Sequence, residues 1–181
     1  MATVHELLAA GTFHESTVEE IADRAGVARA TVYQHFPSRL NLVDAICDTF
    51  DANPALIRIR ETVELLDPSA ALTETIENVV RFWSSEDAVL NQLYGVAAID
   101  PAAQALVERQ REDRRGEMTR LARHLHRAGR LRPGLGERRA LTTLMLLTSY
   151  ESFRELRHTG LSDREVIRTL QENARELLLP N

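Results

Sequence analysis

Side chains that can donate hydrogen bonds are concentrated in one short stretch of the chain, residues 29–35. This stretch carries Arg29, Thr31, Gln34 and His35, with Tyr33 beside them. An arginine can donate two hydrogen bonds to a guanine edge, whereas hydroxyls and ring N–H groups suit phosphate oxygens. These residue types at this spacing indicate contacts with nucleic acid.

Two short helices joined by a tight turn are expected to position these side chains. The apolar residues of 18–25 recur at the i, i+3, i+4, i+7 spacing of a helix face, and Thr17 with Glu20 makes a capping box at its start. Gly26 ends this helix, and the next one runs through Tyr33. A glycine in a three- to four-residue turn between short helices is typical of a helix-turn-helix, whose second helix enters the major groove.

Helical periodicity continues to the end of the chain, without the apolar/polar alternation of strands. We therefore predict an all-α fold, with a three-helix helix-turn-helix domain over residues 1–52 and a larger helical domain over 53–181. Asn53-Pro54 marks the boundary, because the residue before a proline avoids the α region. Ser38 is expected to cap the helix that completes the first domain.

In the second domain, two apolar stripes precede Asp100-Pro101, and a long charged helix follows. The mixed signs of residues 109–117 indicate a solvated face and no DNA-binding surface. The last two helices are expected at about 137–159 and 162–178, and Ser162 with Glu165 makes the capping box of the second.

The composition excludes several classes of protein. No apolar run reaches the ~18 residues of a membrane span, and the N-terminus lacks the basic and apolar regions of an export signal. Cys47 is the only cysteine, which fits a reducing compartment, so we expect a cytoplasmic protein with no membrane partner. Catalytic motifs, phosphate-cradling loops and Cys/His clusters are not found. We expect no enzyme, no cofactor, and no catalytic or metal residue.

The segment from Thr17 to Arg39, TVEEIADRAGVARATVYQHFPSR, resembles the DNA-binding signature of the TetR (tetracycline-repressor-like) family. That signature reads approximately T-V-x-x-I-A-x-x-A-G-V-S-x-x-T-x-Y-x-H-F-x-[SN]-K. The match lies within the first quarter of the chain, and the remainder is similar to the family only in its helix pattern.

The resemblance implies a set of DNA-binding residues at and after the turn. Thr17 would cap its helix against a phosphate, and Arg39 stands where the family commonly has a phosphate-binding lysine. The residues expected to face bases are Arg29, Ala30 and Thr31, and those expected to hold phosphates are Tyr33 and His35. Tyr33 could instead be a core aromatic residue, and His35 an ordinary surface histidine.

Two departures bear on affinity. Ala28 replaces the serine that usually caps the recognition helix, a loss of about 1 kcal/mol. Residues 1–50 hold three arginines against seven carboxylates, and the formal net charge of the chain is −5. Affinity for DNA depends largely on cations that neutralise phosphates, so we expect it to be modest and strongly dependent on salt.

For the second domain, the resemblance implies a binding site for a small-molecule effector, as yet unknown, and a homodimer interface formed by the last two helices. Ligand cavities are mostly apolar, and any single candidate could equally be core. The candidates are Phe82, Trp83, Tyr94, Met118, Met145, Tyr150 and Phe153.

The function that this pattern favours is a transcriptional regulator that binds a pseudo-palindromic double-stranded DNA operator. Repression is the commoner habit of the family, and effector binding would change the separation of the two recognition helices. The alternative is a helical dimer that binds a ligand or a protein and has lost DNA binding. Salt-dependent binding to DNA separates the two.

Overall fold

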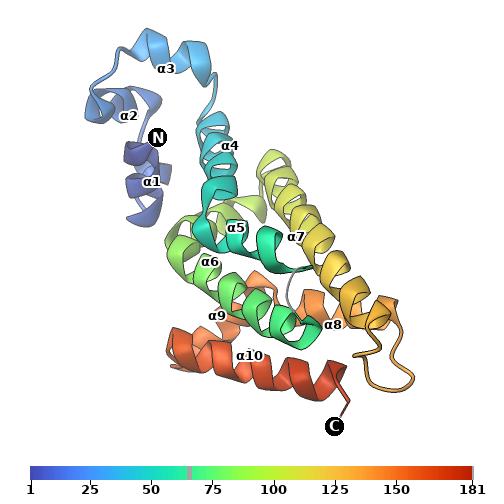
Figure 1. The fold of residues 1–181 in the computed structure, drawn as a ribbon. Helices are drawn as coiled ribbons and strands as arrows, with labels where there is room; N and C mark the ends of the chain where they lie inside the picture. Colours follow the sequence, from blue (N-terminus) through green and yellow to red (C-terminus); the bar gives the residue numbers. More distant parts are fainter. Residues whose placement is uncertain (65–66, 181) are drawn as a thin grey trace. The chain divides into compact units, whose positions relative to one another are not determined.

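The computed structural model describes residues 1–64 and 67–180, and every regular element among them is helical (Figure 1). The all-α prediction is confirmed. In chain order the elements are α1 (Ala2–Ala9), η1 (Phe13–Glu15), α2 (Val18–Ala25), α3 (Arg29–His35), α4 (Arg39–Thr49), η2 (Phe50–Ala52), α5 (Pro54–Thr62), α6 (Pro68–Ala97), α7 (Pro101–Arg127), α8 (Glu137–Leu147), α9 (Tyr150–His158) and α10 (Asp163–Leu178).

The chain divides into two compact units. The first contains Met1–Ala52 with Ser85–Gln110, and the second contains Asn53–Ser84 with Arg111–Asn181. Both α6 and α7 therefore contribute residues to each unit. The end of α6 and the start of α7 pack with the N-terminal helices, although the sequence assigned them to the second domain. The assignment of DNA binding to residues 1–52 and of effector binding and dimerisation to residues 53–181 stays a prediction.

The core of the first unit is formed by one apolar face from each of its helices. α1 packs against both α2 and α4, and the buried faces include Leu7 of α1, Ile21 of α2 and Ile46 of α4. The Arg109 guanidinium of α7 donates to Asp44 at 2.7 Å and to Asp48 at 3.1 Å, both on α4. These charge-assisted hydrogen bonds tie the start of α7 to α4.

The helix starts follow local signals in the sequence. Each of three helix starts has a capping box, formed by an N-cap residue and the residue three positions later. The pairs are Thr17 with Glu20, Ser38 with Asn41, and Ser162 with Glu165. Prolines that read as breakers stand at the first position of α5, α6 and α7, where a missing N–H costs nothing. The predicted starts of α2, α4 and α10 are confirmed.

The second unit differs from its sequence prediction in one element. The helix expected over about 137–159 is two helices, α8 and α9, because the chain breaks at Thr148 and Ser149. The Thr148 carbonyl accepts from the Trp83 indole N–H at 3.0 Å, and its hydroxyl accepts from Arg114 at 3.0 Å. Ser149 then caps α9. These contacts come from α6 and α7, so local sequence does not reveal them.

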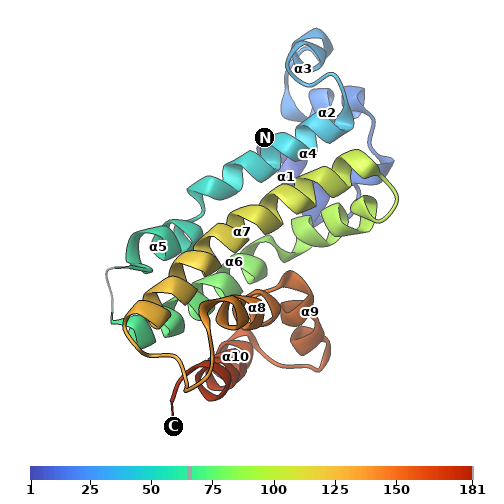
Figure 2. The same ribbon diagram turned by 90° about the vertical axis from the view of Figure 1, so that its right-hand side faces the viewer.

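α8, α9 and α10 lie together in both ribbon views (Figures 1 and 2), and α10 contacts each of the other two. α10 is also tied to α6, since Gln171 donates to the Thr73 carbonyl at 3.0 Å. The two apolar stripes predicted before residue 100 lie on the single helix α6. Among the described residues, no helix has the length and apolar character needed to cross a bilayer.

Candidate nucleic-acid interface

The turn between α2 and α3 is tight because Gly26 takes a left-handed conformation, with φ of 66°. The Val27 N–H then bonds back to the Ala22 carbonyl at 3.1 Å, and the Gly26 N–H to Asp23 at 3.2 Å. A side chain at residue 26 would strain this backbone. The turn brings α3 across α2, as the helix-turn-helix prediction required (Figure 1).

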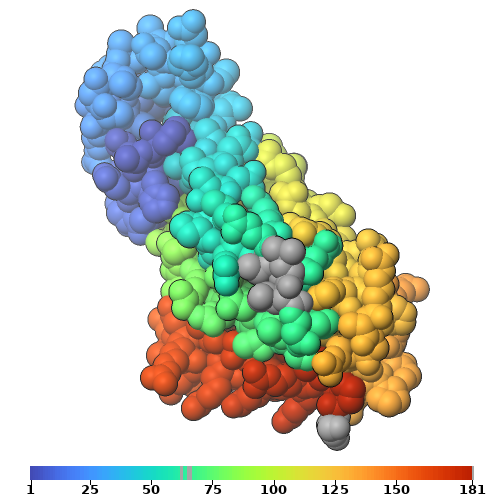
Figure 3. Space-filling view, viewed as in Figure 1, coloured from blue at the N-terminus to red at the C-terminus, as the bar shows by residue number. Residues whose placement is uncertain are grey.

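Helix α3 buries one side chain, that of Val32, and exposes the other six. Arg29, Ala30, Thr31, Gln34 and His35 are all exposed, and the space-filling view shows α2 and α3 at the surface in blue (Figure 3). Ala28 at the N-cap makes no side-chain hydrogen bond. Val32 therefore anchors the helix, and its other positions are available to a partner.

Tyr33 is held by a carboxylate of the preceding helix. Its hydroxyl donates to Glu19 at 2.8 Å, and the side chain is 44% exposed, so it is not a core aromatic. This hydrogen bond is the main reason that the pKa of Tyr33 is raised. The pKa of Glu19 is lowered, first by its own backbone N–H and then by Tyr33. The phenol thus stays protonated at neutral pH, and its single O–H is donated to Glu19, so donation to a phosphate would replace this hydrogen bond.

Arg29 makes the same kind of contact one turn further along α2. Its Nη2 lies 3.2 Å from Asp23, and both side chains are largely exposed. Glu19 and Asp23 are four residues apart, so they share a face of α2 that points toward α3. Sequence reasoning missed the pairing of these carboxylates with Tyr33 and Arg29. The i, i+4 spacing of two acids beside the turn is the signal that could have found it.

Thr17 is exposed at the start of α2, and its side chain is engaged in the capping box. The Glu20 N–H donates to the Thr17 hydroxyl at 3.2 Å, and the Thr17 N–H donates to the Glu20 carboxylate at 2.7 Å. These bonds lower the pKa of Glu20, the backbone bond most strongly. The structure thus places Thr17 at a helix start, where backbone N–H groups favour an anion.

Arg39 lies apart from the α3 group. Its Nη2 donates to the Phe13 carbonyl, and its guanidinium carbon lies 4.9 Å from the centre of the Phe13 ring. The contact links the start of α4 to η1. The role of Arg39 toward phosphate stays a prediction, and α3 with the start of α2 forms the candidate reading surface.

Most of the predicted effector residues gather in the second unit. Phe82, Trp83, Tyr150 and Phe153 are buried, with ring centres 4.9 Å (Phe82–Trp83), 5.5 Å (Trp83–Tyr150) and 6.2 Å (Tyr150–Phe153) apart. Met118 is buried and Met145 half-buried in the same unit, and Tyr94 belongs to the first unit. We call the four rings the aromatic cluster.

Comparisons with known proteins agree with this geometry. Residues 1–46 match the family described as bacterial regulatory proteins, tetR family. A TetR-family transcriptional regulator from Rhodococcus sp. has a TM-score of 0.78 at 16% identity, with 98% of this chain and 95% of that chain covered. A transcriptional regulator from Saccharomonospora viridis in complex with choline has a TM-score of 0.76 at 18% identity, with 99% and 95% covered.

A tetR-family regulatory protein from Rhodococcus RHA1 has a TM-score of 0.74 at 19% identity, with 99% of this chain and 95% of that chain covered. At these identities the likeness establishes the fold. A search of curated proteins gave no match.

The chain combines a helix-turn-helix with a larger helical body, and its first 46 residues match a family of bacterial regulatory proteins. Residues 1–46 are similar to the tetR family of bacterial regulatory proteins, and the whole chain has the fold of the TetR-family regulators compared above.

Proposed function

We propose that this protein is a transcriptional repressor that binds a pseudo-palindromic operator as a homodimer and leaves it when a small molecule binds. Residues 1–52 would read the DNA, and residues 53–181 would bind the effector and the second protomer. The observation that carries the proposal is the exposure of six of the seven side chains of α3, directly after a helix-turn-helix turn.

Within α3 the side chains divide by position along the helix. Arg29, Ala30 and Thr31 occupy the first turn, the part of a recognition helix that reaches base edges. Tyr33 and His35 lie in the second turn, and Thr17 caps α2, where hydroxyl and ring N–H donors suit phosphates. Specificity would therefore come from the first turn and orientation from the others.

The aromatic cluster is the proposed effector site. Its four buried rings adjoin polar groups, because the Trp83 indole N–H donates to the Thr148 carbonyl and the Arg114 guanidinium to the Thr148 hydroxyl, at the break between α8 and α9. Apolar walls with a few placed polar groups are typical of small-molecule sites. The choline complex of the Saccharomonospora viridis protein supports a small-molecule ligand in this fold.

Trp83 is the only tryptophan of the chain, so its emission reports on the cluster without a label. An effector that binds there is expected to change this emission in proportion to the release of DNA. Release of DNA with unchanged Trp83 emission would place the effector elsewhere.

A second candidate function is favoured by the acidic face of α2. Glu19 accepts a hydrogen bond from Tyr33, and Asp23 pairs with Arg29, so two of the predicted DNA contacts already have partners. The negative charges of these carboxylates also repel the phosphates of DNA. A chain of this kind could act as a helical dimer that binds a ligand or a protein and no longer holds DNA. Binding to DNA decides between the candidates.

The deciding experiment is fluorescence anisotropy with DNA from upstream of the protein's own gene, at low and physiological salt. We expect saturable binding that weakens as salt rises, because each phosphate contact releases counterions. The Tyr33→Ala/His35→Ala variant should lose it. Arg127→Ala removes an exposed arginine from the end of α7 and should bind as the unchanged protein does. Failure to bind at either salt would reject the repressor proposal in favour of the second candidate.

A further inference from the structure

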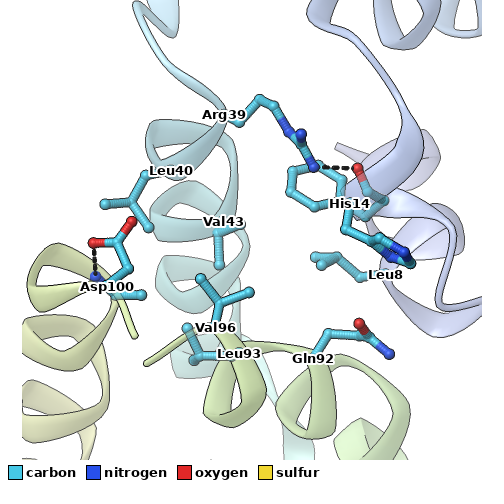
Figure 4. A pocket seen from close by; sticks show the side chains of 11 residues that line it. Leu8, His14, Arg39, Leu40, Val43, Gln92, Leu93, Val96 and Asp100 are labelled. Atoms are coloured by element: carbon cyan, nitrogen blue, oxygen red, sulfur yellow. Dashed lines mark hydrogen bonds between the residues drawn. The ribbon is translucent and has the colours of Figure 1, made fainter. Parts of the chain in front are cut away.

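A cavity of about 280 Å³ lies within the first unit, beside the start of α4 (Figure 4). Arg39, Leu40 and Val43 of α4 line one wall, and Gln92, Leu93 and Val96 of α6 line another. Each helix contributes residues at the i, i+1, i+4 spacing, which share one face. In Figure 4, Arg39 lies at one end and Gln92 at the other, with Val43 and Val96 between them.

The lining is apolar except near its ends. Leu8 of α1, Phe13 of η1 and Ala103 of α7 complete the apolar surface. A volume of about 280 Å³ is close to the lower limit of known small-molecule sites. The cavity therefore suits a small ligand with an apolar body.

The cavity is lined by one cation, Arg39, and one anion, Asp100. Arg39 forms no ion pair in the described part of the chain, and its Nε is buried without a hydrogen-bond partner. The Asp100 carboxylate is instead held at the start of α7, where one of its oxygens accepts from the N–H groups of Ala102 at 2.8 Å and Ala103 at 3.3 Å. His14 lies 3.6 Å from Glu15.

A buried donor without a partner is costly, and an anion that reaches Arg39 would remove that cost. A neutral ligand would leave the guanidinium as it is. The amide of Gln92 offers a further polar contact at the opposite end of the cavity.

We propose that this cavity binds a small carboxylate with an apolar body, its head on Arg39 and its body against Val43, Leu93 and Val96. The site is distinct from the aromatic cluster, since all of its lining residues belong to the first unit. Only three residues separate the end of α3 from the start of α4, so a ligand held between α4 and α6 acts on the helix that carries α3.

One consequence rests on the proposed DNA-binding function. The bound carboxylate neutralises the positive charge of Arg39, close to the helices α2 and α3 that would contact DNA. The affinity for the operator therefore falls severalfold. The binding of the carboxylate itself does not depend on DNA.

The test is isothermal titration calorimetry of the DNA-free protein with octanoate and, as its neutral partner, octanol. We expect octanoate to bind about tenfold more tightly than octanol, because a charge-assisted hydrogen bond is worth at least that factor. Arg39→Gln should remove the preference. Arg24→Gln, which removes an exposed arginine of α2, should keep it.

Val96→Phe provides an independent variant, because Val96 is 41% exposed and has room for a larger side chain that fills the cavity. It should abolish octanoate binding while circular dichroism shows an unchanged helix content. Octanoate binding that survives both Arg39→Gln and Val96→Phe, or equal affinity for octanoate and octanol, would overturn the proposal.

The DNA arm separates this site from the proposed function. Octanoate should release operator DNA from the unchanged protein and not from Val96→Phe, which retains Arg39. If octanoate binds as expected but the protein never binds DNA, the cavity is confirmed and the repressor proposal fails.

Discussion

Two carboxylates of α2 determine which hydrogen-bond donors of α3 are free to contact a partner. Tyr33 and Arg29 are two donors of the predicted DNA-binding set, and each is bonded to an acid of α2, Tyr33 to Glu19 and Arg29 to Asp23. These pairs are exposed, and exposed ion pairs contribute little to stability. Their main effect is electrostatic, because they place negative charge where phosphates must approach.

Replacing both acids with amides, Glu19→Gln and Asp23→Asn, should strengthen DNA binding several-fold at physiological salt. The plot of log K against log salt should steepen by about 0.9 for each phosphate contact that a freed side chain gains. Anisotropy titrations over a salt series measure both quantities. Glu108→Gln/Glu112→Gln removes an equally spaced exposed pair from α7 and should change neither, and weaker binding by the α2 variant would refute the argument.

Cys47 is buried on α4, and burial raises the pKa of its thiol to about 12, with smaller contributions from Asp44 and Asp48. At pH 7 the reactive thiolate is then roughly one part in 10⁵ of the total. Iodoacetamide should leave the folded protein unlabelled and modify it in urea. Rapid labelling of the native protein at neutral pH would contradict this burial.

At the scale of elements, the sequence predicts helices well wherever the signal is local. Thr17 with Glu20 and Ser162 with Glu165 satisfy backbone N–H groups within one turn, so their helix starts could be located from spacing alone. The break at Thr148 could not be, since no glycine or proline marks it and its partners Trp83 and Arg114 are distant in sequence.

The same contrast applies to the candidate site. The exposure of α3 follows from its pattern, in which Val32 alone faces the core. The position of the Arg39 side chain cannot be predicted from the sequence pattern, because its contact with Phe13 joins residues 26 positions apart. The cavity beside Arg39 is formed by four helices and η1, and such a space is defined only by tertiary packing.

The uncapped start of α3 gives a prediction at this scale. Ala28 has the extended backbone of an N-cap, with φ of −65° and ψ of 138°, but no side-chain acceptor. Ala28→Thr should raise the free energy of unfolding by about 1 kcal/mol. Ala28→Val has the same shape without the hydroxyl and should give no gain. Urea denaturation measures both variants, and equal stability would show that no cap forms.

At the scale of the whole molecule, α8 and α10 present apolar side chains that the single chain does not cover. Leu146 is 65% exposed on α8 and Leu177 is 47% exposed on α10, and these two helices contact each other. The last helices were the predicted dimer interface, and exposed leucines on adjacent helices support that proposal.

Leu146→Lys should therefore convert a dimer of about 41 kDa, twice the chain mass of 20.4 kDa, to the monomer in light scattering. Operator affinity should fall roughly 100-fold or more, because the second half-site is no longer bound by a linked partner. Ile99→Lys changes the most exposed large apolar residue in the described part of the chain, at 87%, and should remain dimeric. A dimeric Leu146→Lys protein would place the interface elsewhere.

The hydrogen bond from Tyr33 to Glu19 also has a consequence in time. Differences in affinity between related complexes arise mainly from dissociation rates. A reading helix whose donors have an acceptor of their own can return to it each time a phosphate contact opens, so the bound state is short-lived. Under the repressor proposal, an operator held in this way would be cleared quickly when the effector concentration rises, and transcription would follow with little delay.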